Sequence, residues 1–377
     1  MSTLKVNTIN AATSGQAVAV DVQNPRSFRN LIINGAFQVS QRSTSATGHG
    51  MGVVDRWNHY REGVDEVPTF AQVDVASGTT PYQKGFRKAF KITNGDQTSG
   101  AGADDYITID HKMEAQDIAN SGWDYTSTSS YITLSFWVKS SVAQTFYGYL
   151  RSQDGTSKLY PFETGSLTAD TWTKVTKTIP GVSGLQFDND NGFGLQFRLL
   201  LFRGTNKTGS VTLDQWGNYN SSVRTPDNTS TWYTTNDATL EITGVQLEVS
   251  SYATDFEHRT YSDELARCQR YYYLVAKGDD KCMGLGVMSR SSELFTTVHF
   301  PVEMRATPTL EATSGTDYYK LLRNNDNDTF THFDLGSYTS NIVAELTNDD
   351  QVGANVNNCG FVRTNNASSR VGFLAEL

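Results

Sequence analysis

The chain has 377 residues, enough for two or three domains of ordinary size. Only 19% of the residues are charged, and Thr (45 residues), Ser, Asn and Gly take their place, a composition that favours strands and turns over helical bundles, coiled coils and collagen. The 31 basic and 40 acidic residues give a net charge of -9 with no block of Lys or Arg, which argues against nucleic acid as a partner.

The first 28 residues are polar and contain few large apolar side chains. We expect residues 1–28 to be an extended segment, ordered only by packing on another chain or on the next domain. This end also lacks the pattern of a signal peptide, and no apolar run reaches the roughly 18 residues of a membrane span. We therefore expect no membrane insertion.

Alternation typical of strands begins near Leu31 and recurs to about residue 257. The clearest strand is 131–139, where the even-numbered residues from Ile132 to Val138 are apolar and predict a core face, with the odd-numbered residues on the surface. The run 195–201 repeats this pattern, with Gln196 and Arg198 on its polar face. A third candidate strand places Phe86, Phe90 and Ile92 on one face.

Within 238–249 the apolar positions change from even to odd at Gly244, which predicts a β-bulge. Many short strands separated by Gly, Asn and Ser turns predict an all-β fold, with residues 29–257 forming a β-sandwich of the jelly-roll kind.

One helix is predicted, from Ser262 as N-cap to about Tyr271, and it makes residues 258–273 a hinge. After it, apolar positions alternate from Leu294 to Met304 and short apolar pieces continue to the end. Residues 274–377 are therefore expected to form a second, smaller β-domain.

No motif of a catalytic site is present. The six His residues are dispersed, and the P-loop, the nucleophile elbow and the dinucleotide-binding pattern are missing, so we expect no enzyme activity and no cofactor. The three Cys residues are too dispersed to indicate a disulfide framework or a zinc site. Asp188 and Asp190 alternate with Asn before Gly192, a pattern of either a solvated turn or a structural calcium loop.

Aromatic residues flanked by Ser, Thr and Asn are the strongest candidates for a binding site. Flat rings beside hydrogen-bonding side chains suit the apolar faces and hydroxyl groups of sugars. The candidate carbohydrate-binding residues are Trp123, Tyr125, Trp216, Tyr219, Trp232 and Tyr233. The alternative is that these rings cover the end of the sandwich or contact another subunit.

Several stretches resemble tail-fibre and related adhesion proteins of bacterial viruses, especially the short-tailed phages of marine and cyanobacterial hosts. They are Asn30–Phe37 with Gln38–Arg42, Asp55–Trp57, the strand Tyr131–Ser141, and Ile242–Val249 running into Phe256–Arg259 and Glu264–Tyr272. The resemblance extends over about residues 29–273 and is weaker on either side.

The resemblance implies a homotrimer whose N-terminus attaches to tail or capsid proteins of the virion. It also implies that the central domain is a carbohydrate-binding jelly roll and that the distal part meets a host receptor. The chain departs from the family in lacking a long repetitive shaft, so we expect a compact appendage, assembled in the host cytoplasm. Five residues match positions of the family that lie where the sandwich, the helix and the second β-domain (274–377, here called the distal domain) meet. We expect them to fix this junction rather than to bind a ligand. They are Gln246, Glu248, Glu257, His258 and Arg259.

Three functions follow from these observations. The first is a virion adhesion protein, or tail fibre, that recognises a host-surface polysaccharide. The second is a purely structural virion component, such as a connector or a head-fibre decoration, with Trp123, Trp216 and Trp232 buried between chains. The third is a depolymerase of capsular polysaccharide.

Overall fold

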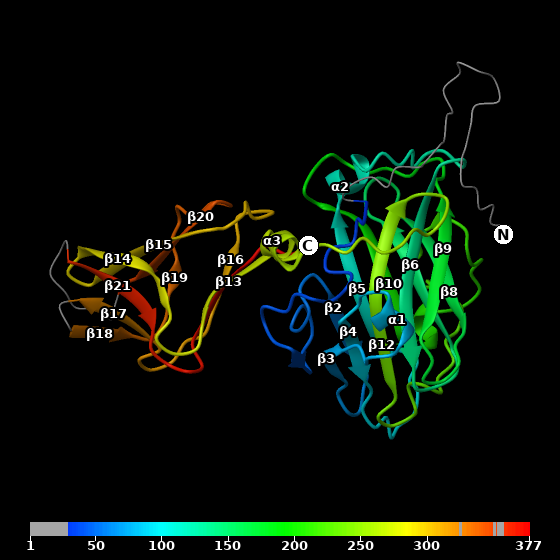
Figure 1. Ribbon diagram of the computed structural model, residues 1–377, viewed down its shortest axis with the longest axis horizontal. Helices are drawn as coiled ribbons and strands as arrows, with labels where there is room; N and C mark the ends of the chain where they lie inside the picture. The colour runs from blue at the N-terminus through cyan, green and yellow to red at the C-terminus, as the bar shows by residue number, and fades with distance from the viewer. Residues whose placement is uncertain (1–28, 324–325, 350–351, 353–357) are drawn as a thin grey trace, which may run out of the picture.

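The computed structural model describes residues 29–377 except 324–325, 350–351 and 353–357, so the predicted attachment segment 1–28 lies outside the described residues. The described chain consists of a large β-sandwich and a smaller β-domain, with one short helix between them (Figure 1). This arrangement confirms the prediction of an all-β fold.

The sandwich contains two antiparallel sheets of six strands each. The first sheet has the spatial order β1 (Ser45–Ala46), β3 (Thr69–Asp74), β4 (Lys88–Thr93), β12 (Thr239–Val249), β6 (Tyr131–Ser140) and β9 (Thr173–Pro180). The second sheet has the order β11 (Gly217–Asn218), β8 (Lys158–Ser166), β7 (Thr145–Ser152), β10 (Phe193–Arg203), β5 (Tyr106–Glu114) and β2 (Asn58–Glu62). The chain crosses repeatedly from one sheet to the other, as in a jelly roll.

The core lies between the two sheets and confirms the predicted faces of two strands. In β6 the even-numbered side chains from Ile132 to Val138 are fully buried, and in β10 the odd-numbered ones from Leu195 to Leu201 are buried against them. The opposite face of β6 is not the surface that we expected. Thr133 is also buried, and its hydroxyl donates to the carbonyl of Ser250, because the chain that leaves β12 covers this face.

The third predicted strand is only partly right. Phe90 and Ile92 lie in β4 and reach the main core, whereas Phe86 precedes the strand and packs with Ala89 in a separate cluster. The ring of Phe86 lies over Gly244 of β12, where a β-carbon would come within 2.5 Å of it.

The predicted bulge at Gly244 is confirmed. The register between β12 and β6 shifts between Thr243 and Gln246, and Gly244 has φ of +65°, a conformation that favours glycine. The bulge explains why the apolar side chains of β12 that face the core change from even-numbered to odd-numbered positions along one strand.

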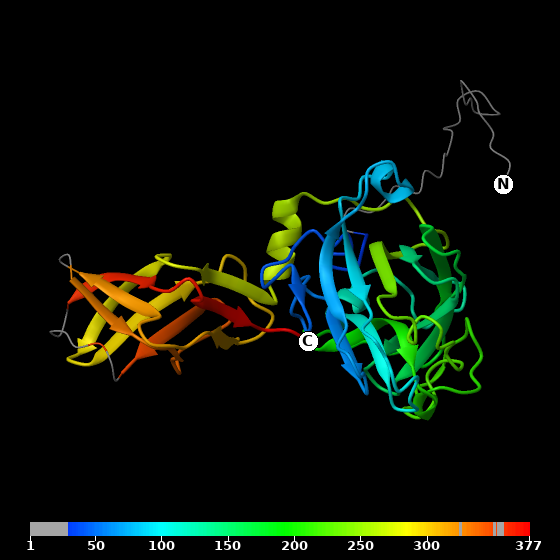
Figure 2. The same cartoon turned by 90° about the horizontal axis from the view of Figure 1, so that it is seen from below.

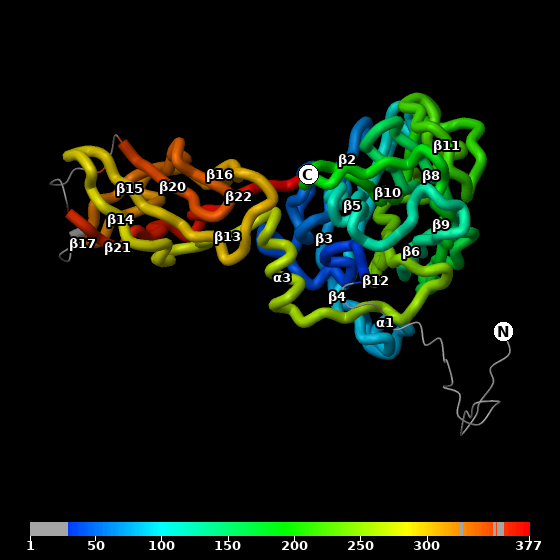
Figure 3. The backbone as a smooth tube through the Cα atoms, turned by 90° about the horizontal axis from the view of Figure 1, so that it is seen from above, coloured from blue at the N-terminus to red at the C-terminus, as the bar shows by residue number. Residues whose placement is uncertain are grey.

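The N-cap of helix α3 (Tyr261–Gln269) is Thr260, two residues before the expected N-cap Ser262. The hydroxyl of Thr260 accepts a hydrogen bond from the Asp263 amide at 3.2 Å, as an N-cap side chain does. Figure 2 shows α3 in the space between the two β-structures, and Figure 3 shows the chain from β12 reaching it by a path beside α1 (Thr80–Gln83).

The distal β-domain contains a three-stranded and a seven-stranded sheet. The smaller sheet has the order β13 (Tyr272–Lys277), β22 (Arg370–Leu374) and β16 (Thr309–Ala312). The larger has the order β18 (Asp326–Phe330), β17 (Tyr319–Arg323), β21 (Cys359–Thr364), β14 (Cys282–Arg290), β15 (Glu293–His299), β20 (Val343–Asn348) and β19 (Asp334–Leu335). The predicted strand from Leu294 ends at His299, before Pro301, although Phe300 and Met304 beyond it are still buried.

Three short helical segments were not predicted: α1, α2 (Ala115–Ala119) and the 3₁₀ turn η1 (Thr205–Lys207). Over the residues that the structure describes, no helix is both long and apolar enough to cross a membrane.

Candidate functional site

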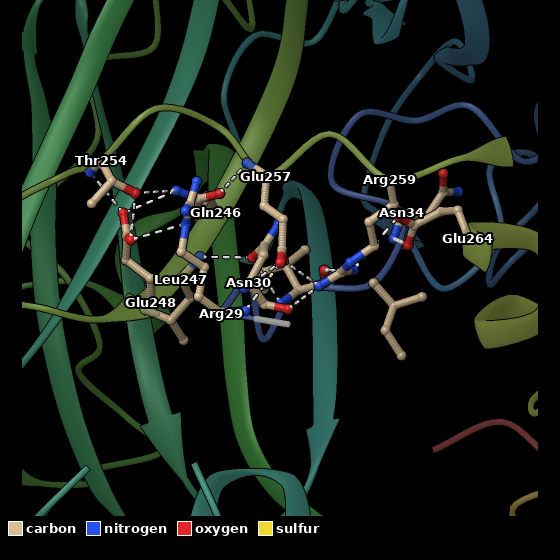
Figure 4. Close-up of polar contacts among 12 residues, drawn as sticks. Arg29, Asn30, Asn34, Gln246, Leu247, Glu248, Thr254, Glu257, Arg259 and Glu264 are labelled. Carbon is tan, nitrogen blue, oxygen red and sulfur yellow. Dashed lines mark hydrogen bonds and ion pairs between the residues drawn. The ribbon is translucent and has the colours of Figure 1, made fainter. Parts of the chain in front are cut away.

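Four of the stretches that carry the resemblance, those containing Asn30, Gln246, Glu257 and Glu264, meet in one hydrogen-bonded network beside the sandwich (Figure 4). The amide of Asn30 donates to the Glu257 carboxylate at 2.9 Å, and its side-chain oxygen accepts from the Leu247 amide at 3.0 Å. The Arg259 guanidinium donates to the Asn30 carbonyl at 2.5 Å and to Glu257 at 2.9 Å. Residues more than 200 positions apart are thereby joined.

Buried polar side chains of β12 complete this network (Figure 4). The Gln246 side chain accepts from the Glu257 amide at 2.8 Å and donates to Glu248 at 2.9 Å, and Glu248 accepts from the hydroxyl of Thr254 at 2.6 Å. Burial would raise the pKa of Glu257, but the Asn30 amide and Arg259 outweigh it and lower the pKa. Apart from Arg259 Nε, which is buried without a hydrogen-bond partner among the described residues, these groups are used by their neighbours. This agrees with a role in fixing the link from sandwich to helix rather than in binding a ligand.

A second set of contacts joins the sandwich to the distal domain. The fully buried Arg56 pairs with Glu376 and stacks on Tyr271, with its Cζ atom 3.4 Å from the ring centre. The Glu114 carboxylate, at the end of β5, accepts two hydrogen bonds from the Arg270 guanidinium, one from Nε and one from Nη2, each at 2.8 Å. The distal domain is therefore held to the sandwich by other residues than the five that we expected at the junction.

The structure corrects the prediction for three of the six aromatic candidates. Trp232 and Tyr233 have no exposed surface and Trp123 is 3% exposed, because their rings belong to the sandwich core. The Trp232 indole donates to the Thr239 carbonyl at 3.0 Å, and Tyr233 stacks on Phe202. Rings enclosed by their own chain can neither stack on a sugar nor contact another subunit, so these two expectations are wrong for these residues. The remaining alternative, packing within the sandwich, agrees with their burial.

The other three candidates are half-buried. Tyr125 packs edge-on against Phe187, and Trp216 packs on Tyr160 while its indole donates to the Pro180 carbonyl at 2.8 Å. Tyr219 follows β11, and its amide donates to the Ser157 carbonyl at 2.8 Å, which places it beside the outward side of the second sheet. Of the six rings, Tyr219 alone joins the polar surface described below.

The loop Asp188–Gly192 forms hydrogen bonds within itself, with α2 and with the distal domain. Asp190 accepts from the Gly192 amide at 2.9 Å, and the carbonyls of Asp190 and Gly192 accept from the first amides of α2. The side chain of Asn191 donates to the Arg305 carbonyl in the distal domain at 2.5 Å. Among the described residues, His, Cys, Asp and Glu form no group of three that could bind a metal ion.

The second sheet presents a polar, tyrosine-rich surface on the side away from the core. We call this surface the outer face. Strand register aligns its side chains in rows across the sheet. One row contains Asn58, Asp110, Arg198, Tyr149 and Pro161, the next contains Tyr60, Thr108, Leu200, Tyr147 and Glu163, and a third contains Lys112, Gln196, Arg151 and Leu159.

A buried carboxylate lies at the centre of the outer face. Asp110 has no exposed surface, and one of its oxygens accepts from Gln196 at 2.5 Å and from Arg198 Nε at 3.0 Å. The second Asp110 oxygen and the Thr108 hydroxyl are buried without a hydrogen-bond partner among the described residues. Unpartnered buried polar atoms are rare in folded proteins, and water or a ligand hydroxyl group would satisfy these two.

Aromatic rings surround this centre. Tyr60, Tyr106, Tyr147, Phe193 and Tyr219 are half-buried, and Tyr149 is buried among them. The Arg198 guanidinium lies 5.6 Å from the Tyr60 ring and 5.9 Å from the Tyr149 ring. Burial raises the pKa of Tyr60, Tyr106 and Tyr147, so these rings keep their protons and can donate hydrogen bonds at neutral pH.

Among the residues of the outer face, only Gln196 and Arg198, as polar positions of a strand, and the ring of Tyr219 were predicted from the sequence. The rows of this face come from five strands within 58–203, about two fifths of the chain, and their residues converge only when the strands pair. The alternation of β10 was the signal available in the sequence, because it separated Arg198 from the core.

A cavity of about 350 Å³ lies where the outer face meets the distal domain. Asn58 of β2 is part of both surfaces. The charged groups of the cavity are paired with one another, since Arg42 lies 3.4 Å from Glu376 and 3.6 Å from Glu311, and Arg370 also pairs with Glu311. The two pairs of Arg42 join the sandwich to the distal domain, whereas Arg370 and Glu311 both belong to the distal domain.

Comparison with known proteins gave no match to a family model and none to a curated protein. Among solved structures, an enzymatically active domain of tailspike protein 4 of bacteriophage CBA120 aligns at 10% identity over 60% of this chain and 22% of that chain, with a TM-score of 0.31. A putative sugar-binding protein from Bacteroides thetaiotaomicron aligns at 13% identity over 59% of this chain and all of that chain, with a TM-score of 0.30. A family 11 carbohydrate-binding module from Clostridium thermocellum aligns at 13% identity over 57% and 98%, with a TM-score of 0.25.

Proposed function

We propose that this protein binds a polysaccharide on a bacterial surface through the outer face of the second sheet. The observation that supports this most directly is the ring of half-buried tyrosines around Asp110, Gln196 and Arg198. Sugars offer apolar C–H faces to such rings and hydroxyl groups to such polar side chains. A flat sheet face gives an extended polymer several rows of contact.

We further propose that the protein is an adhesion component of a bacteriophage virion, a tail fibre or a related appendage. The support for this step is the sequence resemblance over residues 29–273, whose motifs form the network around Asn30 and Glu257. In this proposal residues 1–28 attach to tail or capsid proteins, and the protein binds glycan without cleaving it.

Replacing Tyr60 or Tyr147 by Ala is expected to weaken polysaccharide binding by at least about 10-fold, because rings at the centre of an interface contribute most of its binding energy. Both residues lie in one row of the outer face, on opposite sides of Thr108 and Leu200. Binding is measured on an array of immobilised bacterial surface polysaccharides.

Tyr252→Ala is the matched control, since Tyr252 is an exposed tyrosine of the sandwich outside this face. A protein that binds no polysaccharide on the array, or equal losses for all three variants, would contradict the proposal. New reducing or unsaturated ends in the incubated polysaccharide would instead indicate a depolymerase.

A structural virion component is the second candidate, and exposed apolar side chains of the distal domain favour it. Leu285 of β14 lies opposite Phe361 of β21, and Val287 lies beside them on the outward side of the large sheet. In a trimer these residues would be covered. Light scattering is expected to give three times the 41.6 kDa of one chain, and Leu285→Lys is expected to reduce this mass. A stable monomer would count against both the trimer and this candidate.

A further inference from the structure

Three arginines of the outer face stack on aromatic rings but have no acidic partner. The Cζ atom of Arg203 lies 4.3 Å from the centre of the Tyr106 ring, and those of Arg151 and Arg224 lie 4.0 and 5.8 Å from the Tyr219 ring. Among the described residues, none of the three forms an ion pair with a carboxylate, whereas Arg198 on the same face pairs with Asp110.

Arg203 is the most unusual of the three, because it is only 8% exposed. Burying a charge without a counter-charge is unfavourable. Burial and the nearby positive charge of Arg224 both lower the pKa of the Arg203 guanidinium, so the two like charges lie close enough to repel each other. Arg224 Nε is itself buried without a hydrogen-bond partner. An anion placed between these two side chains would neutralise the buried charge of Arg203 and reduce its repulsion by Arg224.

The charge of the outer face is opposite in sign to that of the whole chain, which is -9. Its acidic side chains are Asp110, bound by Arg198, Glu114, bound by Arg270, Glu62, bound by the Tyr106 hydroxyl, and Glu163, which lies beside Tyr147 and forms no ion pair among the described residues. The basic side chains of this face outnumber its acidic ones. They are Lys112, Arg151, Arg198, Arg203 and Arg224.

We infer that the outer face selects an acidic polysaccharide, whose carboxylates are bound by Arg151, Arg203 and Arg224 while its sugar rings lie on the tyrosines. The planar fork of N–H groups on a guanidinium matches a carboxylate. Arg151 donates from Nε to Ser157 at 3.3 Å and from one terminal nitrogen to Gln153 at 2.8 Å, so its remaining N–H groups are the ones that would bind the ligand. This inference rests on the proposed polysaccharide binding and adds the chemical class of the ligand.

The test compares uronic-acid polysaccharides with their own methyl esters, which keep the backbone and lose the charge. Polygalacturonate, alginate and hyaluronate are suitable, and a set of neutral polysaccharides is measured in parallel. We expect the full chain to bind at least one acidic polymer about 10-fold or more tightly than its ester, the size of one charge-assisted hydrogen bond. We also expect this preference to decrease as salt is raised.

Four outcomes are distinguishable. Preference for an acid over its ester supports the inference, and equal binding of both, or binding of neutral polymers alone, overturns it while leaving the proposed function intact. No binding to any polysaccharide counts against the proposed function itself. Equally tight binding of single-stranded DNA would overturn the inference, because it would show attraction to any polyanion.

Variants assign the effect to these arginines. Arg224→Gln and Arg151→Gln, both at half-buried positions, are expected to lower affinity for the acid about 10-fold and leave affinity for the ester unchanged. Arg290→Gln removes the same charge from an exposed side chain of the distal domain and is expected to change neither affinity. Equal losses for acid and ester would overturn the assignment, and thermal unfolding of each variant shows whether the sandwich is intact.

Discussion

Replacing Glu114 by Ala is expected to reduce the free energy of unfolding by about 3 to 5 kcal/mol, the usual effect of removing one partner of a buried ion pair. Glu114 is 1% exposed and accepts from Arg270, from the Tyr271 hydroxyl and from Gln116. Without it, a guanidinium and a buried hydroxyl lose their partners at the contact between sandwich and distal domain. Denaturant unfolding, followed by circular dichroism, measures the change.

The matched control is Asp74→Ala, which removes an exposed carboxylate paired with Lys88 and is expected to cost less than about 1 kcal/mol. Tryptophan fluorescence separates the two domains, because all six Trp residues lie between positions 57 and 232 and therefore in the sandwich. The ion pair does not stabilise the junction if the free energies of unfolding of Glu114→Ala, measured by circular dichroism and by tryptophan fluorescence, both lie within about 1 kcal/mol of those of the unchanged protein.

Acidification from pH 7 to pH 5 is expected to destabilise the sandwich before most carboxylates titrate. Burial lowers the pKa of His59 to about 4, and burial together with Arg56 lowers the pKa of His111 well below its usual value. Between the unfolded pKa of 6.5 and these folded values, the unfolded chain binds protons that the folded chain does not, so stability falls as pH falls. Each histidine contributes up to about 1.4 kcal/mol per pH unit below roughly pH 6.

Variants without the titrating group test this assignment. His59 stacks on Phe70 at 4.1 Å, so His59→Phe keeps the packing, and His111 accepts from the Ile33 amide at 3.2 Å, so His111→Gln keeps an acceptor. Each is expected to reduce the slope of stability against pH between 6 and 5 by about 1.4 kcal/mol per unit. Slopes unaffected by either variant would show that other groups cause the loss of stability.

Alternation in the sequence was sufficient to predict the sandwich, because a strand with one face in the core repeats every two residues. It was sufficient for β6 and β10 and for the bulge at Gly244, where the phase changed within one strand. It failed at Thr133 and at Phe86, where a separate segment covers the outer side of the first sheet. Such coverage depends on tertiary contacts that strand periodicity does not encode.

Local polarity around an aromatic ring was a poor guide to its exposure. Trp232 and Tyr233 lie among Thr and Asn, yet the turn that contains them directs both rings into the core. The candidate site instead consists of alternate residues from five strands, and the tyrosines of one row come from β2 and β7, more than 80 positions apart. Only the pairing order and register of the strands bring them together.

The network around Asn30 and Glu257 also affects how the protein is made. Its hydrogen bonds join residues separated by 227 positions, and the contact of Arg56 with Glu376 joins residues separated by 320. At a synthesis rate of about 5 to 20 residues per second, Asn30 emerges from the ribosome roughly 10 to 45 s before its partner. During this interval β4 and β6 also lack β12, the strand that pairs with both of them, so chaperones that shield nascent strands are expected to increase the yield of soluble protein.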